Sequence, residues 1–219
     1  YSLRCSLLAL LGRADCCGRI CDNKKESLER LGMFADYCIE NHCYDRPYDF
    51  RSGEQRFRYL FEYASIHADY SEPNWSHVTL FSGLPASGKD WYYKKNLGSL
   101  PSLSLDDIRE EMDVDPADLQ GGVIQMAKER AREFLRAKKD FVFNATNLSR
   151  ELRRQWIQLC RDYHAKVDIV YVERPFEQLL MYNKKRQRVV PEAVISRLID
   201  RMEPPTLAEC YEMEVYLND

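Results

Sequence analysis

The sequence lacks an apolar run long enough to cross a lipid bilayer, which takes about 20 consecutive residues in a helix. The segment SLLALLG near its start is too short, and no cleavage-site pattern follows it. We therefore expect neither a membrane span nor a signal peptide. An initial Met is also missing, so the chain can be read as a piece of a longer protein.

An excess of positive charge is missing as well. The chain has 32 Lys and Arg against 35 Asp and Glu, a formal net charge of −3 at pH 7. A protein that coats long stretches of nucleic acid neutralises many phosphates with cationic side chains. The charge argues against that class, but it is compatible with an enzyme that holds one end of a nucleic acid through a few phosphates.

C-x-x-C pairs, the usual signature of a structural zinc site, are absent from the eight cysteines. Most of these cysteines lie in the first 43 residues, where their spacing does not support a zinc site. We expect reduced, mostly buried thiols in a cytosolic protein. The cysteines considered as zinc ligands are Cys16, Cys17, Cys21, Cys38 and Cys43.

Without internal repeats, the chain divides by its pattern of residues. Residues 1–44 carry apolar side chains at helical spacing and predict a helical segment. Residues 45–76 are rich in Tyr, Arg and acids, and we expect a connector that packs on the next domain, with a helix around 53–64. Its side chains either hold it against that domain, which we favour, or stack on a base. They include Tyr48, Phe50, Arg56, Arg58 and Tyr59.

Strand and helix patterns alternate over residues 77–219. Alternation of this kind predicts an α/β domain with a parallel sheet covered by helices on both faces. Pro116 is expected near the start of a helix over residues 115–139. The predicted strands are 77–83, 102–105, 141–146, 167–172 and 211–217, and the predicted helices are 88–97, 106–112, 115–139, 149–165, 175–186 and 191–202.

The first predicted strand leads into GLPASGK, which has the spacing G-x-x-x-x-G-K. Backbone N–H groups of such a loop form a concave nest for phosphate, and the following helix presents its positive end. The alternative, a tight turn with a surface lysine, fits the strand–loop–helix context less well. We predict a P-loop NTPase fold that binds ATP or another NTP. The expected donor contacts are Gly83, Pro85, Ser87, Gly88 and Lys89, whose ammonium would reach the β- and γ-phosphates.

The residue after the loop lysine is normally Ser or Thr, whose hydroxyl binds the Mg²⁺ that bridges the β- and γ-phosphates. Here it is Asp90. A carboxylate is also a good Mg²⁺ ligand, directly or through water. We therefore expect Asp90 to hold the metal. The alternative is an acid turned to solvent or to a neighbouring N–H.

Two further motifs carry candidate chemistry. Asp106 and Arg109, in LDDIR after the second strand, share a helix face at the sheet edge where ligands bind. The carboxylate can accept a hydroxyl proton while the guanidinium holds a substrate phosphate. Asp107 is expected only to cap the helix.

Arg186 and Arg188 lie in a basic segment between two predicted helices. This segment is either a solvated loop or a source of positive charge for the transferring phosphoryl group.

Residues 77 to about 210 resemble the polynucleotide 5′-kinases in the order and spacing of four motifs. The resemblance implies a helical lid around residues 183–202 and Mg²⁺-dependent transfer of an NTP γ-phosphate to the 5′-OH of RNA or DNA. It implies that Asp106 is the general base, that Arg109 contacts the acceptor phosphate and that Arg186 contacts the donor. The motifs are G-x-P-x-S-G-K, D-D-x-R, T-N at 146–147, and N-x-x-R at 183–186. Relatives usually place an Asp just before T-N, where this chain has Asn144-Ala145.

The segment LLALLGRADCCGR resembles the final helix of HD-type metal phosphohydrolases, in which Asp15 would be a metal ligand. The histidines and the His-Asp pair that complete such a site are absent, so we expect Asp15 to be inert. Together the two regions resemble bacterial bifunctional end-healing proteins. That resemblance implies an upstream phosphohydrolase domain and a nucleic-acid ligase that acts downstream.

Two alternatives remain open. Sugar and antibiotic kinases share the loop and the lid, so the chain can be a small-molecule kinase of the same fold. It can also be an NTP-binding switch with no acceptor. Asp106 beside Arg109 argues against the switch, which needs no base next to a phosphate clamp.

Overall fold

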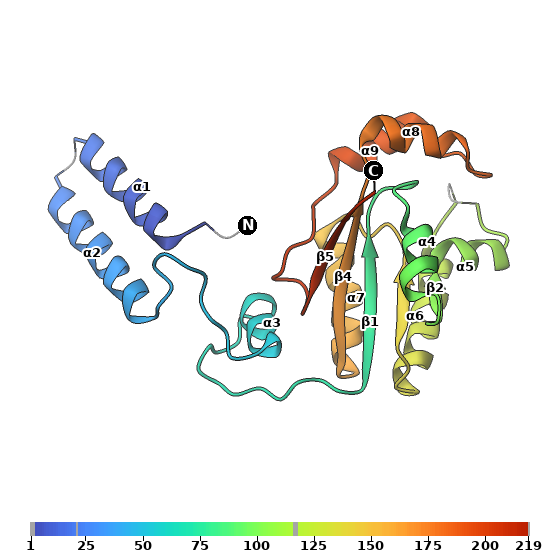
Figure 1. Ribbon diagram of the computed structural model, residues 1–219, viewed down its shortest axis with the longest axis horizontal. Helices are drawn as coiled ribbons and strands as arrows, with labels where there is room; N and C mark the ends of the chain where they lie inside the picture. The colour runs from blue at the N-terminus through green and yellow to red at the C-terminus, as the bar shows by residue number, and fades with distance from the viewer. Residues whose placement is uncertain (1–2, 21, 116–117, 219) are drawn as a thin grey trace. The chain divides into compact units, whose positions relative to one another are not determined.

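The computed structural model describes residues 3–20, 22–115 and 118–218, so Cys21 and Pro116 lie outside the described part of the chain. The chain forms two compact units, Tyr1–Arg51 and Ser52–Asp219 (Figure 1). The division falls inside the connector expected at 45–76. No helix among the described residues is long and apolar enough to cross a membrane.

The first unit is a pair of helices, α1 (Cys5–Gly18) and α2 (Lys24–Glu40), followed by an irregular segment. A backbone hydrogen bond from Ser6 N to Tyr44 O, 2.8 Å long, ties the start of α1 to that segment. Among the described residues of this unit, only Ala9 and Cys38 are buried. The pair is therefore held together with very little apolar core.

The seven described cysteines are free thiols, as expected from the sequence. The expectation of mostly buried thiols holds for Cys160 and Cys210 in the second unit, but Cys17 in the first is exposed. Burial, followed by hydrogen bonding to the Cys5 thiol, raises the pKa of Cys38 to about 11. The Cys38 thiol therefore holds its proton at neutral pH.

The second unit is built on a five-stranded sheet in which all paired strands are parallel, in the order β2-β3-β1-β4-β5 (Figure 1). β1 lies at the centre, so the loop that follows it emerges from the middle of the sheet's carboxyl edge. The α/β parallel sheet expected from the sequence is confirmed. The strands are β1 (Ser76–Ser82), β2 (Ser102–Ser104), β3 (Phe141–Asn144), β4 (Ala165–Glu173) and β5 (Met213–Leu217).

Helices cover both faces of the sheet. Alternate strand residues such as Leu80 and Phe143 face a large core with α3, α5, α6 and α7, while Phe81 and Val142 face a smaller core with α4 and η1. α8 and α9 lie beyond the carboxyl ends of the strands (Figure 1). The helices are α3 (Gly53–Phe61), α4 (Lys89–Tyr92), the π-helical η1 (Tyr93–Leu97), α5 (Leu105–Glu111), α6 (Gly121–Arg136), α7 (Arg150–Asp162), α8 (Phe176–Lys184) and α9 (Glu192–Asp200).

Helix α3, in the expected connector, packs on the large core of the second unit. Phe57 stacks on Tyr211 with ring centroids 5.2 Å apart, and Phe61 is buried beside it. Glu54 is buried but paired, since Arg161 Nη2 donates to Glu54 Oε1 at 2.7 Å. Removing one partner of a buried ion pair typically costs about 3–5 kcal/mol, so this pair helps to fix α3 in place.

Three local expectations needed correction. The helix expected at 88–97 widens into η1 after Tyr92, and the helix expected from 115 begins at Gly121. Ser104, not Asp107, supplies the cap of α5: its hydroxyl accepts a hydrogen bond from Asp107 N at 3.2 Å. Ser149 caps α7 as predicted.

Candidate active site

The loop between β1 and α4 can exist only with glycine at its two ends. Gly83 has φ +151°, and a Cβ there would lie 2.4 Å from Val172 O. Gly88 has φ +107°, and a Cβ there would lie 2.0 Å from Asn218 Nδ2. Both angles are costly for a residue with a Cβ, so close approach to β4 and to the end of β5 fixes the shape of the loop.

Asn218, which the sequence did not predict as a site residue, holds the phosphate loop in place. It is buried, its Nδ2 donates to Ser87 O at 3.0 Å, and its backbone N donates to Glu173 O at 2.8 Å. Arg174 Nε donates to Asn218 O at 3.2 Å. No linear pattern could have indicated this role, because it depends on β5 lying beside β4.

The loop contains an unsatisfied hydroxyl. Ser87 is buried, and within the described part of the chain its Oγ has no hydrogen-bond partner. A buried polar atom without a partner is costly. An anion in the loop would satisfy it, so this observation fits the phosphates of an NTP.

The Lys89 side chain bonds back to the first residues of the loop. Its Nζ donates to Gly83 O at 3.0 Å and to Leu84 O at 2.8 Å. Carbonyl oxygens are weaker partners for an ammonium than phosphate oxygens, since hydrogen bonds between two ionised groups are the stronger ones. The Lys89 ammonium thus lies against the loop, and a phosphate bound there would compete with these carbonyls for it.

The electrostatics of Lys89 show which charges surround it. Desolvation lowers the pKa of Lys89 to about 8, and the positive charge of Arg186 contributes in the same direction. The negative charges of Asp90 and Asp106 act in the opposite direction, Asp90 more strongly. Three other predicted site residues, Asp90, Asp106 and Arg186, therefore lie close enough to influence the Lys89 ammonium.

Asp90 is hydrogen-bonded to a residue of the neighbouring strand. Its Oδ1 accepts a hydrogen bond of 2.7 Å from Asn144 Nδ2, at the end of β3. Asp90 is exposed, so the carboxylate retains oxygen lone pairs for other ligands. A hard oxygen donor at the edge of the phosphate loop fits Mg²⁺.

The predicted pair on α5 is formed. Arg109 Nη1 donates to Asp106 Oδ1 at 2.5 Å, with Asp106 largely exposed and Arg109 mostly covered. Gln120, absent from the sequence prediction, accepts from Arg109 Nε at 2.7 Å and donates to the carbonyls of Asp115 and Asp118. The guanidinium is thus held on two sides, while the carboxylate faces solvent.

The loop between α8 and α9 carries the predicted lid arginines. Asn183, buried near the end of α8, donates to Val190 O at 2.7 Å and accepts from Val190 N at 3.1 Å. This double contact closes the loop that holds Arg186 and Arg188. Arg188 lies 3.8 Å from Glu110 of α5, and both side chains are exposed, so this contact contributes little stability.

The T-N pair joins the end of β3 to the start of the phosphate loop. Gly83 N donates to Thr146 O at 3.0 Å, and Asn147 Nδ2 donates to Phe81 O at 2.8 Å. Ser82 Oγ donates to Asn147 O at 3.1 Å, and Asn147 has φ +43°. Asn is among the few residues with a side chain that adopt this conformation readily.

Arg153 is the largest fully buried side chain near the site, and sequence reasoning gave it no role. Its Nε and Nη2 bind Glu209 at 2.7 and 3.1 Å. Its Nη1 donates to the carbonyls of Asn147, Leu148 and Glu203. One guanidinium thus fastens the T-N turn to the segment after α9.

Other candidate residues have local partners. Asp15, in the first unit, forms an exposed ion pair with Arg19 at 2.9 Å. In the expected connector, Arg56 donates to a backbone carbonyl and Arg58 to Glu54, and Tyr48 packs edge-on against Phe50.

Comparison with known proteins shows the fold. Kti12 from Chaetomium thermophilum, in complex with ADP-AlF3, is 16% identical with a TM-score of 0.50, over 64% of this chain and 88% of that chain. A putative kinase from Chloroflexus aurantiacus is 15% identical with a TM-score of 0.54, over 66% and 86%. A chain of the Pnkp1/Rnl/Hen1 RNA repair complex is 16% identical with a TM-score of 0.53, over 63% and 46%.

These similarities show the α/β fold of P-loop NTPases. The family model described as AAA domain matches residues 78–205, which include the phosphate loop, the α5 pair and the whole α8–α9 segment. The match covers more than half of the chain. The chain therefore belongs to the AAA domain family.

Proposed function

We propose that the chain is a polynucleotide 5′-hydroxyl kinase that transfers the γ-phosphate of ATP or another NTP to the 5′-OH end of RNA or DNA. The observation that carries the proposal is the Asp106–Arg109 pair near the Lys89 loop. A general base beside a phosphate-binding cation is what an acceptor with both a hydroxyl and a phosphate requires. A 5′-terminal nucleotide has both groups.

The phosphate loop holds the donor. Backbone N–H groups between Gly83 and Gly88, the Ser87 hydroxyl and the Lys89 ammonium bind the phosphates, with Pro85 in the outer turn of the loop. Asp90 holds Mg²⁺, which when bound neutralises charge on the β- and γ-phosphates. Arg186 and Arg188 reach the donor from the lid, and Arg186 neutralises the charge that develops on the transferring group.

The α5 pair acts on the acceptor. Asp106 accepts the proton of the 5′-OH as the O5′–phosphorus bond forms. The bond from the γ-phosphorus to the bridging oxygen breaks, and NDP leaves with that electron pair. Arg109, held by Gln120 at 2.7 Å, binds the acceptor's nearest phosphate and orients the hydroxyl.

The similarity to the RNA repair complex supports this proposal as a matter of fold, and the chain spans 46% of that protein. The same proposal includes a phosphohydrolase domain that precedes this region in a longer protein. It also includes a nucleic-acid ligase that acts after the kinase. A small-molecule kinase is the second candidate, because the phosphate loop and the lid serve either acceptor.

An acceptor comparison tests the proposal. The chain is incubated with γ-labelled ATP and Mg²⁺, and 5′-OH RNA, 5′-OH DNA or a sugar mixture is offered as acceptor. We expect label on a 5′-OH oligonucleotide. Label on a sugar alone would favour the second candidate, and tight NTP binding with no transfer to any acceptor would favour a switch.

A further inference from the structure

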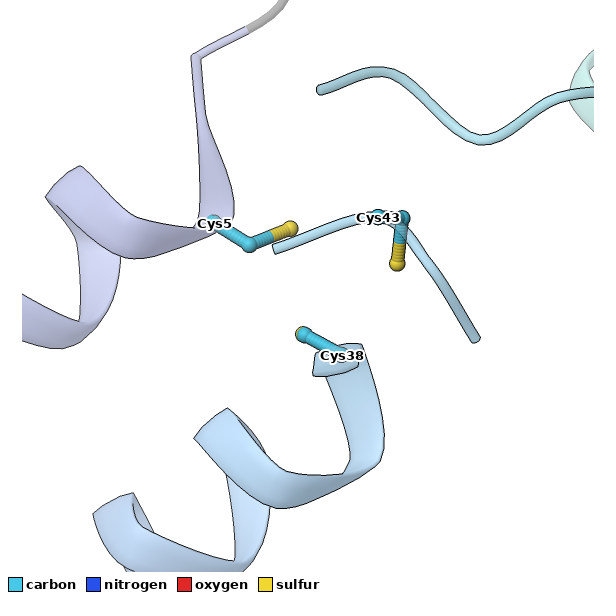
Figure 2. Close-up of side chains that lie close together, drawn as sticks. All are labelled: Cys5, Cys38 and Cys43. Atoms are coloured by element: carbon cyan, nitrogen blue, oxygen red, sulfur yellow. The ribbon is translucent and has the colours of Figure 1, made fainter. Parts of the chain in front are cut away.

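Three thiols of the first unit lie together although their residues are spread along it. The Sγ atoms of Cys5, Cys38 and Cys43 are all within 4.8 Å of one another (Figure 2). Cys5 begins α1, Cys38 lies in the last turn of α2, and Cys43 follows that helix. Cys16 and Cys17, which the sequence also offered, do not join this cluster.

Backbone hydrogen bonds hold the three cysteine positions close to one another. Cys43 N donates to Cys38 O at 2.9 Å, and Ser6 N donates to Tyr44 O at 2.8 Å. The first contact fixes the turn after α2, and the second fixes the start of α1 beside it. The thiols are therefore brought together by the backbone and do not depend on flexible side chains alone.

The separation of the sulfurs suits a single ion. Two thiolates bound tetrahedrally to one Zn²⁺, with bonds of about 2.3 Å, lie roughly 3.8 Å apart. The limit of 4.8 Å between these sulfurs is about 1 Å longer, which side-chain rotation can supply. Cys38 and Cys43 are also separated by four residues, a spacing that zinc pairs use.

The first unit lacks the core that would otherwise hold its helices together. Only Ala9 and Cys38 are buried among its described residues, and none of them belongs to either core cluster. Units this small commonly need a disulfide or a metal to fold stably. A cross-link between the start of α1 and the end of α2 would supply what packing does not.

We propose that Cys5, Cys38 and Cys43 bind one thiophilic divalent cation of the Zn²⁺ class. Each thiol releases its proton to solvent and binds as a thiolate, and a water molecule or a fourth ligand completes the tetrahedron. The site fastens α1 to α2 and is separate from the Mg²⁺ proposed at Asp90. The proposal differs from the expectation, drawn from spacing, that Cys38 and Cys43 bind no zinc.

Cobalt titration of the reduced full chain tests this site. Co²⁺ in a thiolate site gives sulfur-to-metal charge-transfer absorption, and added Zn²⁺ should bleach it. We expect one ion per chain, and at least about tenfold weaker binding in Cys5→Ser and Cys43→Ser, since loss of even an outer partner costs about 10–100-fold. Cys16→Ser and Cys17→Ser are the matched controls and should bind as the parent does.

Circular dichroism of each variant shows whether its helices form, so that weak binding is not mistaken for unfolding. Zn²⁺ should also raise the thermal stability of the parent more than that of a folded Cys5→Ser variant at the same Zn²⁺ concentration. Absence of charge-transfer absorption in the reduced parent would overturn the proposal. Equal Zn²⁺ binding in the control and cluster variants would overturn it too, as would an intact mass showing a disulfide between two of the three residues.

Discussion

Among single residues, the half-buried Lys89 of the phosphate loop has the clearest consequence. Desolvation lowers the pKa of Lys89 to about 8, so its positive charge is present below that pH and is lost above it. The charged form binds phosphate. NTP affinity should therefore fall as pH rises through about 8, with the fall moderated because a bound anion raises the same pKa.

Affinity for a fluorescent NTP, measured from about pH 7 to 10, checks this prediction. Lys89→Arg is the matched control, because a guanidinium keeps its charge over this range. Its affinity should be weaker but nearly constant with pH. Lys89→Ala should lose NTP binding and phosphoryl transfer at every pH. A parallel decline in the wild type and Lys89→Arg would show that another group titrates.

The acid after that lysine makes a second residue-scale prediction. Without metal, Asp90 repels the triphosphate, and with Mg²⁺ it becomes a ligand. Metal removal should therefore weaken NTP binding far more in the wild type than in Asp90→Asn or Asp90→Ser. Asp107→Asn, a change at an exposed acid on α5, should keep the wild-type dependence. Equal metal dependence in all four proteins would leave Asp90 as an acid bound only to Asn144.

Among the structural elements, the loop between α8 and α9, which we propose is a lid, is held by Asn183 and contains Arg186. An arginine that neutralises the transferring phosphoryl group contributes about 10³-fold or more to kcat. We expect Arg186→Ala to lower kcat by about that factor, and Arg186→Lys to restore little, because a point charge lacks the bidentate fork.

Steady-state kinetics with saturating acceptor measures the effect of these lid variants. Lys184→Ala, an exposed basic residue of α8, is the control and should keep its kcat. If Arg186→Lys matched the wild type, local positive charge alone would explain the role of this position.

The sequence predicted every strand of the sheet and most of the helices, because short apolar runs and helix caps such as Ser149 are local signals. It did not predict η1, where the helix widens after Tyr92. It also placed the start of α6 too early. The loop before α6 is held by the Gln120 side chain, and that contact depends on Arg109 lying opposite.

The site residues that the sequence predicted also belong to local patterns, and those that it did not predict depend on the fold. Lys89, Asp106 and Arg186 belong to motifs of fixed spacing, so the sequence could nominate them. Asn218 and Arg153 act through contacts with residues more than 50 positions away, and only the folded sheet brings those residues together. The Asn144–Asp90 hydrogen bond has the same origin, because β3 lies next to β1.

At the scale of the whole molecule, the two units are expected to be functionally separate. Asp15 is exposed and paired only with Arg19 among its described contacts, and it is not part of the thiol cluster. Kinase activity of Asp15→Ala should equal that of the parent, measured as transfer to a 5′-OH oligonucleotide. A loss of kcat with unchanged folding would show that the first unit contributes to the kinase site.

The proposed function is phosphorylation of 5′-OH ends with Asp106 as the base. The most direct measurement compares two strands of one sequence, with a 5′-OH or a 5′-phosphate, as acceptors of label from ATP. We expect label on the 5′-OH strand only, and an Asp106→Ala variant about 10²–10⁴-fold slower with unchanged ATP affinity. Absence of label on the 5′-OH strand, or near-normal turnover by Asp106→Ala, would contradict it.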